Sequence, residues 1–129
     1  MSQKLLQTAM EAMKNSYSPY SGFKVGAALL CRDGGVYTGC NIENSSFSPT
    51  LCAERTAFAK AVSEGKRDFV AIAIVGGRDG VVTAHTPPCG VCRQVMAEFC
   101  DRDFKIITTD TQQIKEFTLA ELLPEAFGL

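Results

Sequence analysis

Apolar residues recur at helical spacing in three stretches of the chain: residues 5–13, 52–64 and 90–100. Residues 118–121 read Thr-Leu-Ala-Glu, which is the pattern of a capping box, and predict a last short helix before Pro124. The polar residues between these stretches fall on the opposite helix faces. The chain is therefore expected to contain several amphipathic helices, each with one face packed against another layer.

Shorter apolar stretches have the length and the flanking turn residues of β-strands: 25–31, 36–41, 69–75 and 104–108. An Asp-Gly-Gly turn at 33–35 should join the first two into a hairpin, because glycine supplies the positive φ that tight turns need. Residues 69–75 are continuously apolar, as in a strand covered on both faces. Residues 76–88 contain paired glycines and prolines and are predicted to be a loop. Helices that alternate with strands predict an α/β layered domain with a mixed sheet.

Composition narrows the class of protein. The chain has 129 residues and a net charge of −1, which fits a single domain over residues 1–129. Balanced charge disfavours nucleic-acid binding, since such domains usually carry a basic surface. No apolar run approaches the roughly 20 residues of a membrane span, and residues 1–16 lack the apolar core of a signal peptide. We therefore expect a cytoplasmic protein with no nucleic-acid or membrane partner.

Six cysteines without an export signal point to metal binding or catalysis, because thiols stay reduced in the cytosol. Cys89 and Cys92 form a Cys-x-x-Cys pair at the start of a predicted helix, a pattern shared by redox pairs, half zinc sites and chance. Cys52 opens an earlier helix. A structural zinc ion takes four protein ligands, whereas a catalytic one takes three and keeps a position open. One pair plus one single cysteine favours the catalytic arrangement.

Two charged residues follow Cys52. Glu54 shares a helix face with Ala57 and Phe58, so its carboxylate should point inward, as a partner of the helix dipole or as a proton shuttle beside the metal. Arg55 would offset the negative charge that three thiolates leave on Zn²⁺ if it bonded to one of the sulfurs. The alternative for Arg55 is an ordinary ion pair at the surface.

The segments around these cysteines, Cys-Ala-Glu-Arg at 52–55 and Pro-Cys-x-x-Cys-Arg-Gln at 88–94, resemble the zinc-dependent nucleoside and nucleobase deaminases. With cysteine as the first ligand, the chain is similar to the small homotetrameric cytidine deaminases. Further matching segments cover nearly the whole chain: 19–21, 25–28, 39–44, 61–65 and 121–124. Pro87 and Val91 depart from the serine and alanine common at those positions. The resemblance implies a three-layer α-β-α sandwich with a mixed, roughly five-stranded sheet and a homotetramer.

In that family a zinc-bound hydroxide attacks C4 of cytosine. Cytidine and 2′-deoxycytidine become uridine and 2′-deoxyuridine with release of ammonia, a step of pyrimidine salvage. The resemblance implies that Cys52, Cys89 and Cys92 hold one Zn²⁺ per chain and that Glu54 shuttles protons. It also implies further contacts: Phe23 against the base, the Ala53 backbone at the pyrimidine, Asn41 and Glu43 at the ribose hydroxyls, and Phe127 in a neighbouring subunit's pocket.

Simpler explanations fit the other candidates. Three cysteines in apolar patterns should only pack: Cys31, Cys40 and Cys100. His85, the only histidine, lies in a polar loop, where it could orient a substrate but is more simply explained as a solvated residue. A Cys-His hydrolase is a weaker alternative because it would have to use this one histidine as its base. Arg93 and Gln94 should support the helix that follows Cys89. Two other functions stay open. One is deamination of a different base or an antibiotic nucleoside, and the other is a structural zinc module with Cys100 or His85 as fourth ligand.

Overall fold

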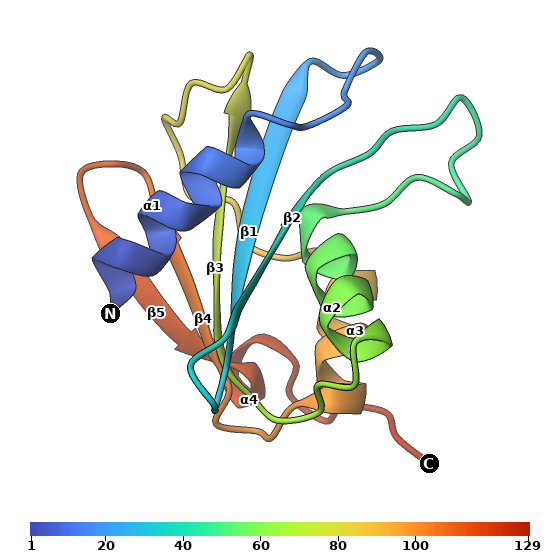
Figure 1. Cartoon of the computed structure of the whole chain (residues 1–129), viewed down its shortest axis with the longest axis vertical. Helices are drawn as coiled ribbons and strands as arrows, with labels where there is room; N and C mark the ends of the chain where they lie inside the picture. The colour runs from blue at the N-terminus through green and yellow to red at the C-terminus, as the bar shows by residue number, and fades with distance from the viewer.

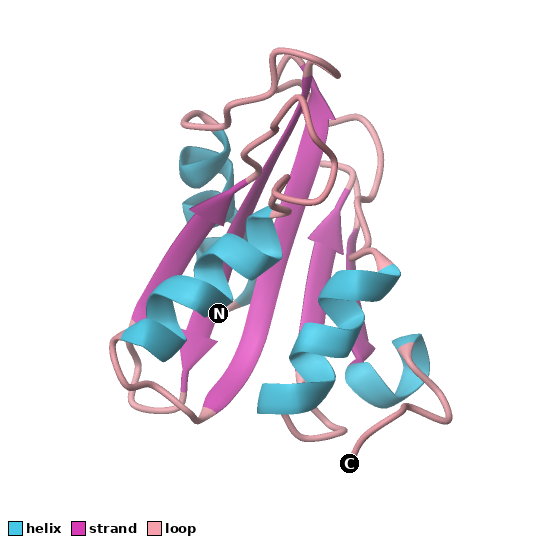
Figure 2. Ribbon diagram, turned by 90° about the vertical axis from the view of Figure 1, so that its right-hand side faces the viewer, coloured by secondary structure: helices cyan, strands magenta, loops and turns pink.

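Five strands form one mixed sheet with helices on both faces (Figures 1 and 2). The computed structural model describes all residues, 1–129. The elements follow in the order α1 (Ser2–Met13), β1 (Phe23–Cys31), β2 (Val36–Cys40), α2 (Ala53–Ser63), β3 (Phe69–Arg78), α3 (Gly90–Phe99), β4 (Lys105–Thr109), β5 (Ile114–Thr118) and α4 (Leu119–Leu122). The three-layer arrangement implied by the sequence is confirmed. None of these helices is both long enough and apolar enough to span a bilayer.

The strands lie in the order β2-β1-β3-β4-β5. β3 and β4 are parallel, and the other neighbouring pairs are antiparallel. The β1–β2 hairpin turns at the predicted Asp-Gly-Gly sequence, where Gly34 has a φ of 94°. The one parallel pair requires a crossover, and the chain makes it through α3, which carries the Cys-x-x-Cys pair. The sheet order therefore fixes where that pair lies.

Alternating side chains of the strands divide the core into two parts. α1 covers one face alone and packs Leu5, Leu6, Ala9 and Met13 against Ala28, Ala71, Ala73, Val75 and Ile107. α2, α3 and α4 cover the other face with Ala57, Phe58, Met96 and Leu119 over Ala27, Leu29, Ile72, Ile74 and Ile106. β3 contributes to both parts, as its continuously apolar sequence predicts.

Two helices begin at a cysteine. Cys52 is the N-cap of α2 and Cys89 is the N-cap of α3, and neither side chain makes a capping hydrogen bond. α4, in contrast, has the complete capping box between Thr118 and Glu121 that the sequence predicts. The sulfurs at the starts of α2 and α3 are thus free to face each other.

The structure corrects two strand predictions. β5 has no counterpart in the apolar pattern because it is an edge strand whose first three residues are exposed. β3 runs further than predicted, since Gly76 and Gly77, expected in a loop, pair with β1. A Cβ atom at Gly76 would lie 2.9 Å from both the Phe23 ring and the Thr86 hydroxyl oxygen. Glycine is required at this point of the strand because these side chains close over it.

Gly39 sets how closely α2 approaches β2. A Cβ atom there would overlap the carbonyl oxygen of Ala53 and lie 2.6 Å from the backbone nitrogen of Ala57. We expect Gly39→Ala to push α2 outward and to lower the free energy of unfolding by about 1–3 kcal/mol. The control is Gly128→Ala, whose added Cβ atom meets nothing within 4 Å. Thermal unfolding of both variants would check this, and equal Tm values would contradict it.

Candidate active site

The N-termini of α2 and α3 meet at three cysteine sulfurs. The Sγ atoms of Cys52, Cys89 and Cys92 all lie within 4.8 Å of one another, and those of Cys52 and Cys89 are 3.8 Å apart. A tetrahedral zinc ion with Zn–S bonds of about 2.3 Å needs sulfurs about 3.8 Å apart. The positive ends of both helix dipoles face the sulfurs and stabilise thiolates. The cluster therefore fits Zn²⁺ in spacing and in chemistry.

No fourth protein ligand joins the cluster. The three sulfurs form the only group of three or more Cys, His, Asp or Glu side chains placed to hold a metal. The remaining cysteines are free thiols elsewhere: Cys31 is in the core, Cys100 packs against that core at the end of α3, and Cys40 ends β2. Burial raises the pKa of each of these thiols. Three ligands leave one coordination position open, which is the arrangement of catalytic zinc and not of a structural module.

Arg55 lies against a ligand sulfur. Its Nη2 atom is 3.5 Å from Cys52 Sγ and 3.3 Å from the carbonyl oxygen of Thr50. Its Nε atom is buried without a hydrogen-bond partner. Hydrogen bonding with Cys92 and with the Arg55 guanidinium lowers the pKa of Cys52 to about 5. Of the two arrangements open from the sequence, the structure shows the contact with sulfur.

Glu54 lies in the first turn of α2 and is only 4% exposed. The inward direction predicted from its helix face is therefore confirmed. Burial raises the pKa of its carboxyl group to about 7, and the nearby charge of Cys52 acts in the same direction.

A cavity of about 300 Å³ opens beside the sulfurs and Glu54. The residues around it come from β1 and the loop before it, from the segment after β2, from the start of α2 and from the loop before α3: Ser21, Phe23, Val25, Asn41, Glu43, Thr50, Leu51, Cys52, Ala53, Glu54, Thr86, Pro87 and Cys89. A larger hollow of about 540 Å³ lies beside α1 and contains none of the cysteines. The chemistry of the lining residues, and not cavity size, identifies the smaller cavity as the site.

Known proteins match this chain over most of its length. The family described as "Cytidine and deoxycytidylate deaminase zinc-binding region" matches residues 1–108. The chain belongs to this deaminase family. A cytidine deaminase of Halalkalibacterium halodurans is 54% identical over 126 residues, which cover 97% of this chain and 92% of that protein. A cytidine deaminase of Sporosarcina psychrophila is 52% identical over 127 residues, which cover 98% of this chain and 90% of that protein.

Solved structures agree with this assignment. The crystal structure of cytidine deaminase from Burkholderia pseudomallei matches with a TM-score of 0.91 and 41% identity, and the match covers 98% of this chain and 99% of that one. The chain is accordingly a zinc-dependent hydrolytic deaminase, with a three-cysteine cluster positioned to bind one Zn²⁺. The zinc cofactor expected from the sequence is thereby confirmed.

Asn41 and Glu43 line the deaminase cavity and are held by their neighbours. Asn41 Oδ1 accepts from the backbone N–H of Val25 at 2.9 Å, and its Nδ2 donates to the carbonyl oxygen of Phe23 at 2.8 Å. Glu43 Oε1 accepts from two backbone N–H groups of the loop before β1, and Oε2 accepts from the Ser21 hydroxyl. The Ser21 hydrogen bond lowers the pKa of Glu43. Both side chains are thus fixed before a ligand arrives.

Phe127 lies outside the cavity of its own chain. Its side chain is 71% exposed, in the C-terminal tail that runs on past α4 (Figure 1). The tail is tied to α3, because Gln94 Nε2 donates to the carbonyl oxygen of Phe127 at 3.0 Å. Arg93 makes a second link, with Nε donating to the carbonyl oxygen of Pro88 and Nη1 to that of Leu122. The support of α3 predicted for Arg93 and Gln94 therefore extends to the tail.

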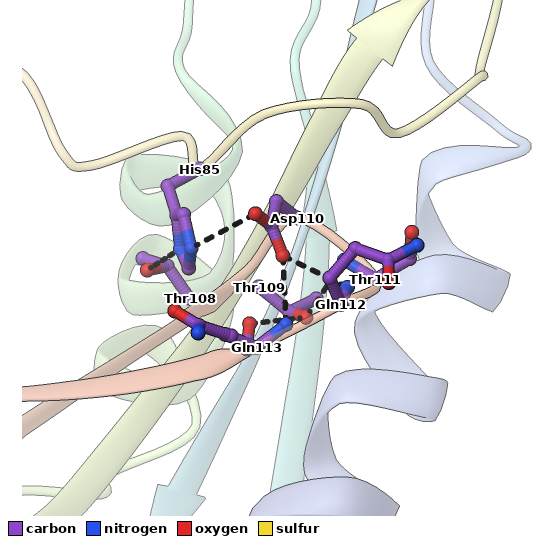
Figure 3. A network of polar contacts seen from close by, with 7 residues as sticks. All are labelled: His85, Thr108, Thr109, Asp110, Thr111, Gln112 and Gln113. Atoms are coloured by element: carbon purple, nitrogen blue, oxygen red, sulfur yellow. Dashed lines mark hydrogen bonds and ion pairs between the residues drawn. The ribbon is translucent and has the colours of Figure 1, made fainter.

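His85 is not the solvated loop residue expected from the sequence. Its side chain is only 18% exposed, and Nδ1 lies 2.7 Å from the hydroxyl oxygen of Thr108 on β4 (Figure 3). Sequence reasoning also missed Thr86 as a lining residue of the deaminase cavity. Its position follows from the close packing over Gly76, a contact between segments that no local pattern reveals.

Proposed function

We propose that this deaminase converts cytidine and 2′-deoxycytidine to uridine and 2′-deoxyuridine with release of ammonia, as a step of pyrimidine salvage. The observation that carries the proposal is the buried carboxyl group of Glu54, which shares one cavity with the metal-binding cysteines. The relatives support cytidine as the substrate, since the proteins from Halalkalibacterium halodurans and Sporosarcina psychrophila are both cytidine deaminases.

In this reaction water adds at C4 of cytosine and the exocyclic amine leaves as ammonia. Zn²⁺, when held by Cys52, Cys89 and Cys92, supplies the Lewis acidity that makes water nucleophilic near neutral pH. Glu54 accepts a proton from the attacking water and delivers it to the ring nitrogen. It then takes the second proton from the hydroxyl group now on C4 and passes it to the amine, which leaves as ammonia while C4 becomes a carbonyl. Its burial supports this role, because burial raises the pKa of the carboxyl group to about 7, where an acid–base group can both take up and release a proton at neutral pH.

Substrate contacts are assigned to residues of the same cavity. Phe23 packs on the base and the backbone of Ala53 recognises the pyrimidine, while Asn41 and Glu43 bind the ribose hydroxyls. All four line the cavity that contains Glu54, which supports the assignment. The Glu43 carboxylate accepts hydrogen bonds from hydroxyls and repels a nearby 5′-phosphate. An unphosphorylated nucleoside therefore suits the cavity better than a nucleotide.

Arg55 has a supporting role in this proposal. Its contact with Cys52 Sγ offsets the net negative charge that three thiolates give to the metal centre, and so preserves its Lewis acidity. Phe127 reaches the pocket of a neighbouring subunit in a homotetramer. What supports this assignment is its exposure, since a large apolar side chain in a tail gains from being covered by another chain.

The proposal also covers the domain organisation of the chain and the cellular compartment in which it acts. Residues 1–129 act as a single catalytic domain, which the one continuous sheet supports, because all strands pair within it. A reducing compartment, the cytoplasm, suits a chain whose six cysteines are all free thiols.

A substrate panel tests the function. Zinc-loaded protein is expected to release ammonia from cytidine and 2′-deoxycytidine, measured by a coupled ammonia assay and by the loss of cytosine absorbance. Cytidine 5′-monophosphate should react at least about tenfold more slowly, because Glu43 opposes the phosphate charge. A chelator should abolish the release and added Zn²⁺ should restore it. Absence of ammonia from every pyrimidine nucleoside would overturn the proposal.

A further inference from the structure

One wall of the cavity belongs to a segment without backbone pairing. Residues 82–88 lead from the loop after β3 to Cys89 and contribute Thr86 and Pro87 to the cavity. No N–H or C=O group of this segment forms a hydrogen bond to another backbone group. Unpaired backbone leaves the conformation of a segment to its side-chain contacts. The position of this wall therefore depends on a few side chains.

His85 makes the shortest of these contacts. Its Nδ1 atom hydrogen-bonds the hydroxyl of Thr108, which is fully buried, at 2.7 Å. Its Nε2 atom lies 3.7 Å from Asp110 Oδ2. Figure 3 shows the imidazole pointing from its loop toward both groups at the end of β4. One ring thus joins the unpaired segment to the sheet at two points.

The end of β4 and the turn to β5, which His85 contacts, are held by their own hydrogen bonds. Asp110 accepts the backbone N–H groups of Gln112 and Gln113, each at 2.8 Å, and the Thr109 hydroxyl donates to the carbonyl oxygen of Gln113 at 2.9 Å (Figure 3). These bonds close the turn between β4 and β5 without help from His85. The imidazole therefore contacts a preformed structure.

Besides His85, the middle of the segment is held only by the packing of Thr86 over Gly76. Arg93 holds the carbonyl oxygen of Pro88 at 2.8 Å and so fixes the end next to Cys89. The Thr86 hydroxyl lies 3.5 Å from the carbonyl oxygen of Gly76, the outer limit of a hydrogen bond. The metal ligand and the cavity wall are consequently held by different side chains.

We propose that His85 is a positioning residue for the nucleoside: through Thr108 and Asp110 it holds Thr86 and Pro87 in the cavity wall. The inference rests on the proposed function, because the ligand that meets this wall is taken to be cytidine. We expect His85 to affect substrate binding and not the chemical step, since Glu54 and the three cysteines lie in the first turns and at the N-caps of α2 and α3. A wall that is already held in place does not have to be ordered when the nucleoside binds, so less binding free energy is lost.

Steady-state kinetics with cytidine test the proposal. His85→Ala is expected to raise KM about tenfold with kcat changed less than about threefold and with one zinc ion retained per chain. His85→Asn should restore most of the wild-type KM, because an asparagine amide reproduces the group that contacts the Thr108 hydroxyl. Thr108→Val removes the same hydrogen bond from the other side and should raise KM in the same way, which covers the case that His85→Ala fails to fold.

Thr83→Ala is the matched control, because Thr83 is exposed, lies in the same segment and makes no hydrogen bond. Its KM should equal that of the wild type. The proposal is overturned if His85→Ala lowers Tm without moving KM, or if His85→Asn leaves KM as high as His85→Ala does. Wild-type turnover of cytidine separates the two proposals: its absence refutes the proposed function, whereas its presence with an unchanged KM in the variants refutes only the role of His85.

Discussion

Glu54→Gln is expected to lower kcat for cytidine by about 10²–10⁴-fold, the contribution of a positioned acid–base group, without loss of zinc. Glutamine has the shape of glutamate but cannot take a proton from water and deliver it to the ring. The side chain is buried at the start of α2, so a neutral replacement also removes the cost of burying a charge. The fold should therefore be at least as stable as in the wild type.

The measurement is single-turnover and steady-state kinetics together with zinc content per chain. Glu98→Gln is the control, because Glu98 is exposed on α3 and makes no hydrogen bond. Its kcat should stay within about twofold of the wild type, as for a surface substitution. A Glu54→Gln enzyme that keeps wild-type kcat would refute the assigned role of the carboxylate.

Replacement of the six cysteines, one at a time, should divide them into two groups of three. Alanine at Cys52, Cys89 or Cys92 is expected to reduce bound zinc from one ion per chain to nearly none and to abolish ammonia release, because two remaining thiolates bind Zn²⁺ weakly. Loss of the metal should also lower Tm, since zinc binds the folded chain in preference to the unfolded one.

The other three cysteines supply the matched controls. Alanine at Cys31, Cys40 or Cys100 should leave one zinc ion per chain and a kcat near that of the wild type, with a modest loss of stability from lost packing. Zinc content by elemental analysis and ammonia release distinguish the groups. A control variant that folds but loses zinc would refute the division, as would a Cys89→Ala enzyme with its metal intact.

The parts of the site that could be predicted from the sequence are those fixed by local geometry. Glu54 and the Cys89–Cys92 pair lie at helix starts, where spacing decides which side chains share a face. That Cys52 joins this pair, 37 positions before Cys89, was implied by the resemblance to the deaminases. The inward direction of Glu54 follows from the apolar residues one turn later. The alternation of helices and strands likewise predicts the layers, because every element must bury one face.

Features that depend on contacts between distant segments could not be predicted in this way. β5 is half exposed at an edge, so its residues lack an apolar run. From the sequence, Gly77 is typical of a loop, and only its pairing with β1 shows that it belongs to a strand. The expectation of a solvated His85 was wrong because its partner Thr108 lies on β4, buried, and no spacing connects the two positions.

The starts of α2 and α3 each lack the capping hydrogen bond that serine, threonine or aspartate would make, a contribution of about 1 kcal/mol per helix. Cysteine at these positions leaves the first-turn N–H groups without a side-chain cap, so a metal that fixes the two sulfurs adds a restraint that the helix starts otherwise lack. When zinc is scarce, the first turns of α2 and α3 should therefore fray before the rest of these helices. Glu54, one residue inside α2, would lose its orientation together with that turn, so metal depletion would disable the proton carrier as well as the Lewis acid.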